Sequence, residues 1–364
     1  MPSNNHFIVA AAGGGKTTRV VATATENNER VALITYTLHN VDEIKKRVYE
    51  KVGAIPPHVE VWSWYSFLLH EMVRPYQRAL YKPRVNQLHF IAGRSALGAK
   101  RADIRRFFFS DLNAIYSDKV ACFACDCIDK SDGAPLRRLA ERFDRIYVDE
   151  VQDLAGYDLE LIEQLLRSDV AVTLVGDHRQ ATYRTNNSAK NSAYTGSHIV
   201  EKFREWEKAG LGTLTFEQET HRSNQTIATF ADGLFPDDPA TISKNDVVTG
   251  HDGVFLVPAA HIDAYIVKFG PQVLRLDVRT NCGAYPALNF GQAKGRTYDR
   301  VLIFPHGKAK DWIKTGDGKH IKPSAAKFYV GVTRARYSVA IVFDGPAKLE
   351  GASLYQPEIG EESA

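Results

Sequence analysis

Short apolar runs separated by helical segments form the main pattern of the first ~210 residues. The runs are residues 7–10, 31–36, 59–62, 145–149 and 170–175. They are nearly continuous and rich in β-branched residues, as expected of strands buried on both faces. Segments with a helical pattern, such as 17–25 and 41–48, lie between them. This alternation predicts an α/β domain in which helices cover both faces of a parallel sheet.

A second α/β pattern follows. Its expected strands are residues 214–216, 254–257, 273–276, 301–304 and 339–343, and the Pro-, Asp- and Gly-rich stretch 233–253 is expected to be loop. We therefore predict two parallel-sheet domains in tandem. The predicted segments are 1–210 for the first domain, 75–140 for a small, basic and aromatic, mostly helical insertion within it, 211–352 for the second domain, and 353–364 for an acidic tail.

Composition narrows the possible partners and compartment. The length of 364 residues suits about two domains. The net charge is only +3, from 46 Lys and Arg against 43 Asp and Glu, so a nucleic-acid site has to be a local groove. The sequence contains no apolar stretch near the ~20 residues that span a bilayer and no signal-peptide pattern. With four Cys in so long a chain, we expect a reducing, cytoplasmic setting and no membrane association.

Three of the cysteines form a C-x-x-C-x-C cluster. Cys122, Cys125 and Cys127 could supply three thiolates to a zinc or iron–sulfur site, but such sites normally take four ligands. No nearby Cys or His completes the set, and Cys282 is distant in sequence. Reduced structural thiols in a helical insertion are the favoured interpretation, and metal binding is the alternative.

A glycine-rich run between a predicted strand and a predicted helix indicates a phosphate loop. Residues 10–17 read A-A-A-G-G-G-K-T, with Ala10 where the common pattern has Gly. Glycines let backbone N–H groups turn toward phosphate oxygens at a helix N-terminus. Lys16 is expected to bridge the β- and γ-phosphates and Thr17 to bind Mg²⁺. The alternative is a simple glycine-rich turn.

Two further strand ends carry candidate catalytic groups. Asp149 and Glu150 follow an apolar run, so Asp149 is placed to hold Mg²⁺ and Glu150 to deprotonate the attacking water. Gln180 lies in the loop after the run 170–175 and could bond the γ-phosphate or the water. An acidic turn and a capped turn are the ordinary alternatives for these two segments.

The motif set resembles the UvrD/Rep-type helicases of superfamily 1A over nearly the whole chain. Eight blocks follow the order found in that family: residues 10–17, 33–37, 63–67, 149–153, 176–180, 219–223, 293–299 and 329–336. The resemblance implies two RecA-like P-loop domains with ATP in the cleft between them. It also implies that Arg222 and Arg334 reach the γ-phosphate and stabilise charge there. Taken alone, each arginine could equally be a surface ion-pair partner.

The resemblance also implies contact residues. The expected nucleotide contacts are Ala12, Gly13, Gly14, Gly15, Lys16, Thr17, Thr18, Arg19, His221 and Gly295. The expected contacts to single-stranded DNA are Thr37, His39, Trp64, Tyr65 and Lys294, where aromatic rings would stack on bases. The alternative is that a tryptophan of this strand is buried core.

The chain departs from the family pattern at several points. Only nine residues precede Ala10, so we expect the upstream adenine-reading glutamine segment to be absent, and GTP is an alternative to ATP. His221 stands where a tyrosine stacks on adenine, and Thr297 where a glutamate contacts ribose. Thr185 occupies the place of a base-stacking aromatic. The 72 positions from Arg222 to Lys294 are too few for a large 2B insertion.

These features predict an ATP- and Mg²⁺-dependent translocase or helicase with a reduced core. Single-stranded DNA is the expected partner, with 3′→5′ polarity implied by the resemblance and RNA as an alternative. A second hypothesis is a nucleotide-dependent regulatory ATPase that acts with a partner, such as a nuclease, without processive unwinding. A P-loop kinase is the least favoured interpretation, because it would not need Arg334 in this context.

Overall fold

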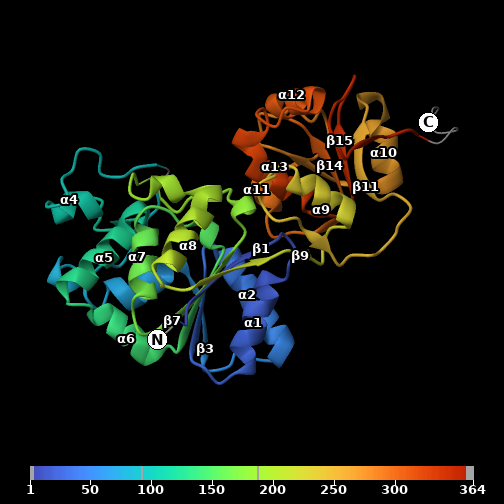
Figure 1. Ribbon diagram of the computed structural model, residues 1–364. Helices are drawn as coiled ribbons and strands as arrows, with labels where there is room; N and C mark the ends of the chain where they lie inside the picture. The colour runs from blue at the N-terminus through green and yellow to red at the C-terminus, as the bar shows by residue number, and fades with distance from the viewer. Residues whose placement is uncertain (1–3, 92, 187, 358–364) are drawn as a thin grey trace. The chain divides into compact units, whose positions relative to one another are not determined.

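Parallel strands organise both halves of the chain in the computed structural model, which describes residues 4–91, 93–186 and 188–357. The chain divides into two units (Figure 1). The first comprises Met1–Val9 and Lys16–Thr215, and the second comprises Ala10–Gly15 and Phe216–Ala364. The phosphate loop therefore groups with the second unit, although the strand and helix on either side of it belong to the first.

The sheet of the first unit has the order β3-β2-β6-β7-β1-β8. Its strands are β1 (His6–Ala10), β2 (Val31–Thr35), β3 (Val59–Ser63), β6 (Arg145–Asp149), β7 (Ala171–Gly176) and β8 (Thr213–Glu217). The neighbours from β3 to β1 pair in parallel, and Ile34 of β2 lies between Trp62 and Val148. Parallel strands end at one edge of a sheet, so the loops with the predicted chemistry meet there.

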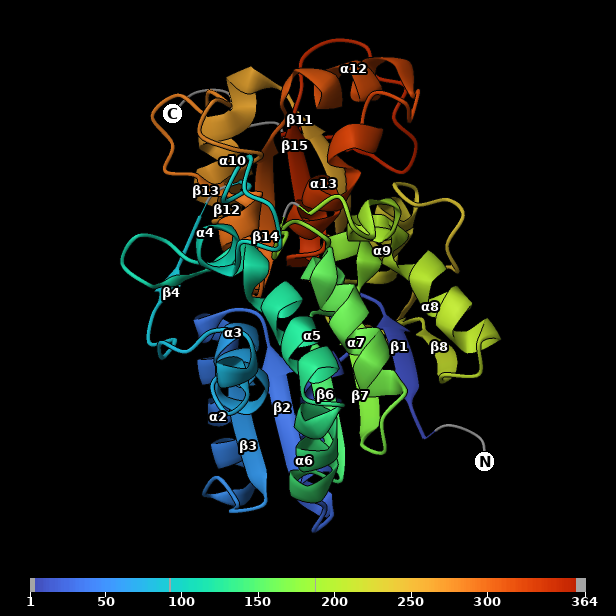
Figure 2. The same cartoon turned by 90° about the vertical axis from the view of Figure 1, so that its left-hand side faces the viewer.

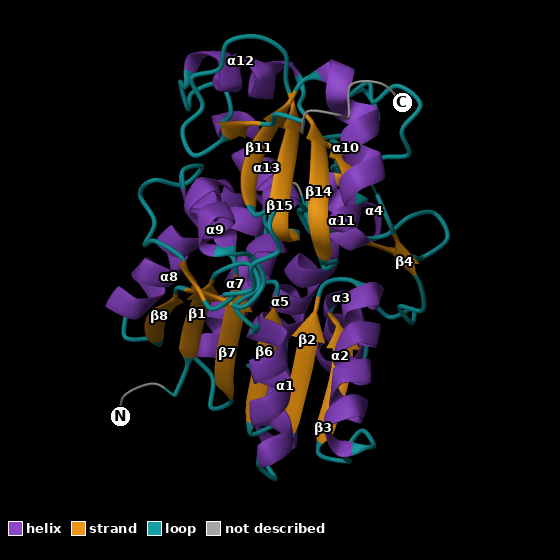
Figure 3. Ribbon diagram, turned by 90° about the vertical axis from the view of Figure 1, so that its right-hand side faces the viewer, coloured by secondary structure: helices purple, strands orange, loops and turns teal. Residues whose placement is uncertain are grey.

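Helices cover both faces of this sheet, as predicted. α1 (Lys16–Glu26) and α2 (Leu38–Val52) lie on one face (Figure 3). α5 (Val120–Lys130), α6 (Ala134–Arg142) and α7 (Tyr157–Leu166) lie on the other (Figure 2). Apolar side chains of α1 and α2, including Val20 and Ile44, form a core with Leu33, Tyr147 and Val175 of the sheet. The edge of the sheet at which these strands end thus rests on a packed core.

The predicted domain boundary at residue 210 differs from the structure, because β8 belongs to the first sheet. Gly212 permits the approach, since a Cβ there would lie 2.6 Å from Cζ of Phe7. The backbone N–H of Thr213 also donates to the carbonyl of Asn5 at 3.1 Å. The run 214–216 is therefore the last strand of the first sheet and not the first strand of the second.

The insertion is only partly helical. Within residues 75–140 it contains α4 (Ile104–Phe108), α5 and most of α6, together with the short strands β4 (Leu88–His89) and β5 (Ile115–Tyr116). The helix α3 (Trp64–Phe67) and a π-helical stretch, Leu68–Val73, precede it. The described residues between β4 and α4 form no helix or strand, which the aromatic and basic pattern did not reveal.

The three clustered cysteines lie on α5 and are buried and free. Burial raises the pKa of the Cys122 thiol to about 11 and that of Cys127 to about 12, so both are neutral at pH 7. Within the described residues no group of three or more His, Cys, Asp or Glu side chains could hold a metal ion.

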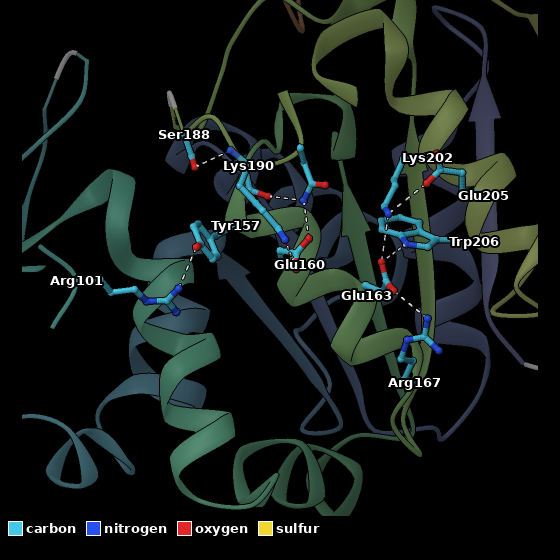
Figure 4. Close-up of polar contacts among 12 residues, drawn as sticks. Arg101, Tyr157, Glu160, Glu163, Arg167, Ser188, Lys190, Lys202, Glu205 and Trp206 are labelled. Carbon is cyan, nitrogen blue, oxygen red and sulfur yellow. Dashed lines mark hydrogen bonds and ion pairs between the residues drawn. The ribbon is translucent and has the colours of Figure 1, made fainter. Parts of the chain in front are cut away.

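Polar contacts fasten α8 (Ile199–Lys208) to α7 (Figure 4). Glu163 accepts a hydrogen bond from Nε1 of Trp206 at 3.0 Å and forms an ion pair with Lys202 at 3.2 Å. Burial opposes ionisation, but hydrogen bonds from Arg167, Trp206 and Lys202 outweigh it and lower the pKa of Glu163 to about 2. The carboxylate is charged at neutral pH and fixes the helix pair.

The second unit has its own six-stranded sheet, ordered β13-β12-β14-β15-β11-β16. Its strands are β11 (Gly253–Val257), β12 (Gln272–Arg275), β13 (Leu288–Asn289), β14 (Tyr298–Phe304), β15 (Ala335–Val342) and β16 (Ser353–Leu354), and all its pairings are parallel. β9 (Glu219–Thr220) and β10 (Ile242–Ser243) form a separate parallel pair. Two parallel sheets in tandem confirm the predicted fold class.

Helices again cover both faces of the second sheet. One face packs against α9 (Gln225–Asp232), α11 (Phe290–Ala293), α12 (Gly307–Thr315) and α13 (Ala325–Val332), and the other packs against α10 (Ile262–Phe269). None of the helices in the described part of the chain is long and apolar enough to cross a membrane.

The predicted tail begins later than residue 353, because Ser353–Leu354 form β16 and pair with β11. Residues 358–364 of that tail lie outside the described residues.

Candidate nucleotide and nucleic-acid site

The phosphate loop follows β1, and its glycines adopt backbone conformations that other residues rarely adopt. Gly13 has φ +78° and Gly15 φ +72°, and the N–H of Gly14 donates to the carbonyl of Ala11 at 3.0 Å. The loop also bonds the segment around β9. Thr220 Oγ1 donates to the carbonyl of Ala12 at 2.7 Å, and the N–H of His221 donates to the carbonyl of Gly13 at 3.1 Å.

The first turn of α1 meets the end of β6. Thr17 Oγ1 donates to Oδ2 of Asp149 at 2.8 Å, and Lys16 is buried at the start of the helix. Burial, reinforced by repulsion from Glu150, raises the pKa of Asp149 to about 6, against the effects of Thr17 and Lys16. A hydroxyl and a carboxylate this close form a hard oxygen pair of the kind that Mg²⁺ prefers.

Glu150 adopts a left-handed backbone conformation, with φ +58°, directly after β6. A non-glycine residue in this region is strained, and such strain often marks a functional residue. Its side chain accepts a hydrogen bond from Nε2 of Gln152. Gln152 is 1% exposed, and its Oε1 accepts the backbone N–H of Asp177 at 3.1 Å. One buried amide thus connects the loop after β6 with the loop after β7.

The loop after β7 is organised by Asp177, which is fully buried. Gln180 donates its amide to Oδ2 of Asp177 at 2.8 Å, and Arg179 forms an ion pair with Oδ1 at 3.3 Å. Burial would raise the pKa of Asp177, but Arg179, Lys16 and the Gln180 amide outweigh it and lower the pKa. Gln180 therefore lies in the same strand-end region as Asp149 and Glu150, as predicted from their positions after parallel strands.

The expected strand contacts at the ends of β2 and β3 have different environments. Thr37 is the N-cap of α2 and accepts the N–H of Asn40 at 3.1 Å, whereas His39 is exposed. Trp64 is 1% exposed, and its Nε1 donates to Oδ1 of Asp158 at 2.8 Å. We therefore correct the assignment of Trp64 to the nucleic-acid surface, because its indole is a core group. Tyr65 is 8% exposed and also buried, and its hydroxyl donates to the carbonyl of Thr185.

A buried polar network lies beside these residues, with Asp158 at its centre. Oδ2 of Asp158 accepts hydrogen bonds from the Thr185 hydroxyl and from the Asn186 amide, the latter at 2.9 Å. Burial raises the pKa of Asp158 to about 6, although Thr185, Trp64 and Asn186 donate to it. All three polar groups of Thr185 are used, since its N–H donates to Asp153 at 3.0 Å and its carbonyl accepts the Tyr65 hydroxyl at 3.0 Å.

The second unit contributes the predicted arginines. Arg222 follows β9 and donates Nη1 to the carbonyl of Thr333 at 3.1 Å. Arg334 is 2% exposed, with Nε donating to the carbonyl of Val330 at 3.1 Å and Nη1 to that of Arg296 at 3.2 Å. These bonds hold both guanidinium groups in defined positions. The structure leaves their predicted contact with the γ-phosphate as a prediction.

The other predicted contacts are distributed over both units. His221 and Gly295 are exposed in the second unit, where Gly295 has φ +86° and Lys294 is half-buried at the end of α11. In the first unit, Thr18 accepts Nη1 of Arg47 at 2.8 Å. Arg19 is exposed and, with α1 and the neighbouring sheet face, lines a cavity of about 280 Å³.

The residues of the phosphate loop and of the β6 strand end fit a nucleoside triphosphate with Mg²⁺. The glycine loop offers backbone N–H groups, Lys16 offers a cation, and Thr17 and Asp149 offer the oxygen ligands. Mg²⁺ keeps several waters and binds substrate phosphates, so it needs few protein ligands.

The structure places Lys16, Thr17, Asp149, Glu150 and Gln180 after strands of one parallel sheet, which is where the sequence pattern predicted them. Sequence reasoning missed Gln152 and Asp158. Gln152 lies inside the acidic block and could have been noted there. Asp158 offers no comparable signal, since its partners are distant in sequence.

Comparisons with known proteins agree with this geometry. The AAA domain family matches residues 1–186, and the viral superfamily 1 RNA helicase core domain matches residues 125–343. No curated protein matches the sequence.

Solved structures of viral helicases are similar at low identity. The PRRSV helicase is 15% identical, covers 94% of this chain and 55% of its own, and has a TM-score of 0.46. Arterivirus nonstructural protein 10 is 12% identical (93% and 59% covered, TM-score 0.49), and its complex with DNA is 13% identical (95% and 62% covered, TM-score 0.47). The chain spans less than two thirds of the length of these structures.

Proposed function

The chain belongs to the viral superfamily 1 RNA helicase core domain family, and from this premise we propose that it is an ATP-dependent motor that moves along single-stranded nucleic acid. The observation that carries the proposal is the set of groups at one edge of the first sheet. Thr17 and Asp149 lie 2.8 Å apart beside Glu150, and Gln180 is fixed in the adjacent loop.

The residues have separate roles in hydrolysis. Lys16 and the glycine loop bind and orient the phosphates, and Thr17 and Asp149 would hold Mg²⁺. When bound, Mg²⁺ supplies charge neutralisation at the phosphate oxygens. Glu150 accepts the proton of the attacking water, and Gln180 orients that water or the γ-phosphate. Arg222 and Arg334 stabilise the charge that develops on the transferred phosphoryl group.

We propose single-stranded DNA as the track and 3′→5′ as the direction, because the motif set resembles UvrD/Rep-type helicases. The matching family is described as an RNA helicase core, so RNA is the competing track. ATPase assays with and without each polymer, with ATP and with GTP, separate these choices. Displacement of streptavidin from a biotinylated 3′ or 5′ end reports the direction.

One observation favours a second function, a regulatory ATPase that switches without processive unwinding. Thr185 stands where a base-stacking aromatic is expected, and it is buried and fully hydrogen-bonded. A strand-displacement assay on a 3′-tailed duplex distinguishes the two functions. Strand-stimulated hydrolysis without displacement, together with a co-purifying partner such as a nuclease, would support the regulatory function.

The test of the hydrolytic centre is Glu150→Gln. Loss of the general base is expected to lower strand-stimulated kcat by about 10²- to 10⁴-fold. ATP binding should persist, since the phosphate loop is untouched. Glu201→Gln, at an exposed carboxylate of α8, is the control and should leave hydrolysis unchanged. Undiminished hydrolysis by Glu150→Gln would exclude Glu150 as the base.

A further inference from the structure

The irregular part of the insertion is strongly basic, although the whole chain is nearly neutral. Residues 74–106 contain nine Lys and Arg and one acidic residue, Asp103. Arg101 pairs with Asp126, but several of the other cations bond to groups that do not neutralise them. Arg74 donates to the carbonyl of Val85 at 3.0 Å, and Arg105 donates to that of Asp111 at 3.0 Å. A concentrated positive charge of this kind attracts a polyanion.

Within this basic segment lies an exposed aromatic ring. Phe90 is 73% exposed, and its ring packs edge-on against Tyr65, with 5.8 Å between centroids and 80° between planes. Tyr65 packs in turn against Tyr36, with centroids 5.9 Å apart. Tyr36 and Tyr65 follow the carboxyl ends of β2 and β3, so the row of rings begins at the functional edge of the sheet.

The middle ring of this row, Tyr65, is anchored. The Tyr65 hydroxyl donates to the carbonyl of Thr185 at 3.0 Å, and the Thr185 hydroxyl donates to buried Asp158. Phe90 therefore packs against an anchored, buried ring while most of its own surface stays exposed, which preorganises it for a flat partner because little further conformational entropy is lost on binding.

We propose that Phe90 stacks on a base of the bound single strand, while the cations of residues 74–106 contact its phosphates. The inference rests on the proposed function and adds a base-stacking contact supplied by the insertion. Aromatic stacking with a basic surface is the usual chemistry of binding to single strands without sequence preference. An acidic peptide would satisfy the charge but would not use the face of the ring.

The chain offers matched controls for this contact. Leu97 and Leu112 lie in the insertion and are 83% and 82% exposed. Leu97→Ala and Leu112→Ala therefore remove exposed apolar surface without removing a ring. Phe90→Tyr keeps the ring. All of these positions are exposed, so the variants should fold.

The experiment measures the binding of a fluorescent oligo-dT strand, and of a matched strand of abasic sites, by anisotropy at fixed salt. Phe90→Ala is expected to weaken oligo-dT binding by about five- to a hundred-fold, the range for loss of one base stack. Binding of the abasic strand should change little. Phe90→Tyr and both leucine variants should bind oligo-dT like the parent protein.

Equal affinity of Phe90→Ala and the parent protein for oligo-dT would overturn the inference. Equal weakening on the abasic strand, or Phe90-dependent binding of polyglutamate, would also overturn it. Failure of the proposed function has a different signature: the parent protein itself would neither bind a strand nor show strand-stimulated ATP hydrolysis.

Discussion

The buried side chain of Gln152 connects two loops of the proposed hydrolytic centre. Its amide nitrogen donates to the Glu150 carboxylate, and its amide oxygen accepts the N–H of Asp177. Gly176 has no side chain at the point of closest approach, where a Cβ would lie 2.4 Å from Oε1 of Gln152. The amide therefore sets the orientation of the proposed base relative to the loop that carries Gln180.

Gln152→Met tests this positioning role, because it keeps the length of the side chain and removes both hydrogen bonds. We expect kcat to fall about 10- to 100-fold, as for a lost hydrogen bond to a charged group, with little change in the KM for ATP. In a Glu150→Gln background the same substitution should have almost no further effect, since the two residues act as a unit. Additive losses measured by steady-state ATPase kinetics would contradict the role.

Single residues were predictable from the sequence where a motif fixed the neighbours. Lys16 and Asp149 follow strands of one parallel sheet, so their proximity follows from topology. Trp64 was assigned wrongly because its burial depends on Asp158, 94 positions away. A pattern of local residues contains no information about such a partner.

At the scale of elements, the segment after β7 folds inward and binds the segment after β6. Thr185 makes this closure with its hydroxyl, which donates to Asp158 and accepts the N–H of Ala155 at 2.9 Å. An aromatic residue at this position would have no room for such bonds. The carbonyl of Thr185 also accepts the Tyr65 hydroxyl, so the same residue holds Tyr65 beneath the proposed strand-binding surface.

Thr185→Val keeps the shape of the side chain and removes the hydroxyl. We expect the free energy of unfolding to fall by about 1–3 kcal/mol, because buried Asp158 loses a donor and the Ala155 N–H loses its acceptor. Thr185→Ser keeps the hydroxyl and should lose less. Urea denaturation of the parent protein and the two variants measures the difference. A valine variant as stable as the serine variant would show that the Thr185 hydroxyl bonds do not stabilise the fold.

Most strands of both sheets were predictable, since buried parallel strands are nearly continuous apolar runs. The short pairs β4–β5 and β9–β10 were not, because two residues are too few to show a period. β8 was predicted as a strand but assigned to the wrong sheet, because a local pattern does not show which strand is its partner. Its partner is β1, which is distant in sequence, and the close approach at Gly212 and the Thr213–Asn5 hydrogen bond appear only in the folded structure.

At the scale of the whole molecule, the phosphate loop groups with the second unit while Lys16 belongs to the first. Gly13 is the tightest point of this arrangement. A Cβ there would lie 2.6 Å from Cβ of Arg222 and 2.8 Å from Oγ1 of Thr220. Gly15 has a similar φ angle, but a Cβ there would meet no atom within 4 Å.

Gly13→Ala and Gly15→Ala are therefore a matched pair that separates crowding from backbone strain. Both place alanine at a positive φ, whereas only Gly13→Ala forces neighbouring atoms apart. We expect Gly13→Ala to lower the free energy of unfolding by about 1–3 kcal/mol more than Gly15→Ala, as for other overpacked sites. Thermal denaturation without nucleotide gives the comparison, and equal losses would show that crowding is unimportant.

The attachment of this loop to the β9 segment affects how genetic data on the protein should be interpreted. A loss-of-function allele at Gly13 would usually be interpreted as a defect in nucleotide binding. Its primary effect would instead be a steric clash of the new side chain with Arg222. A gene split after codon 215, intended to yield two independent halves, would likewise separate the loop from the residues that shape it. Failure of such halves to complement each other would reflect the loss of the contacts between the phosphate loop and the β9 segment, and not the loss of a catalytic residue.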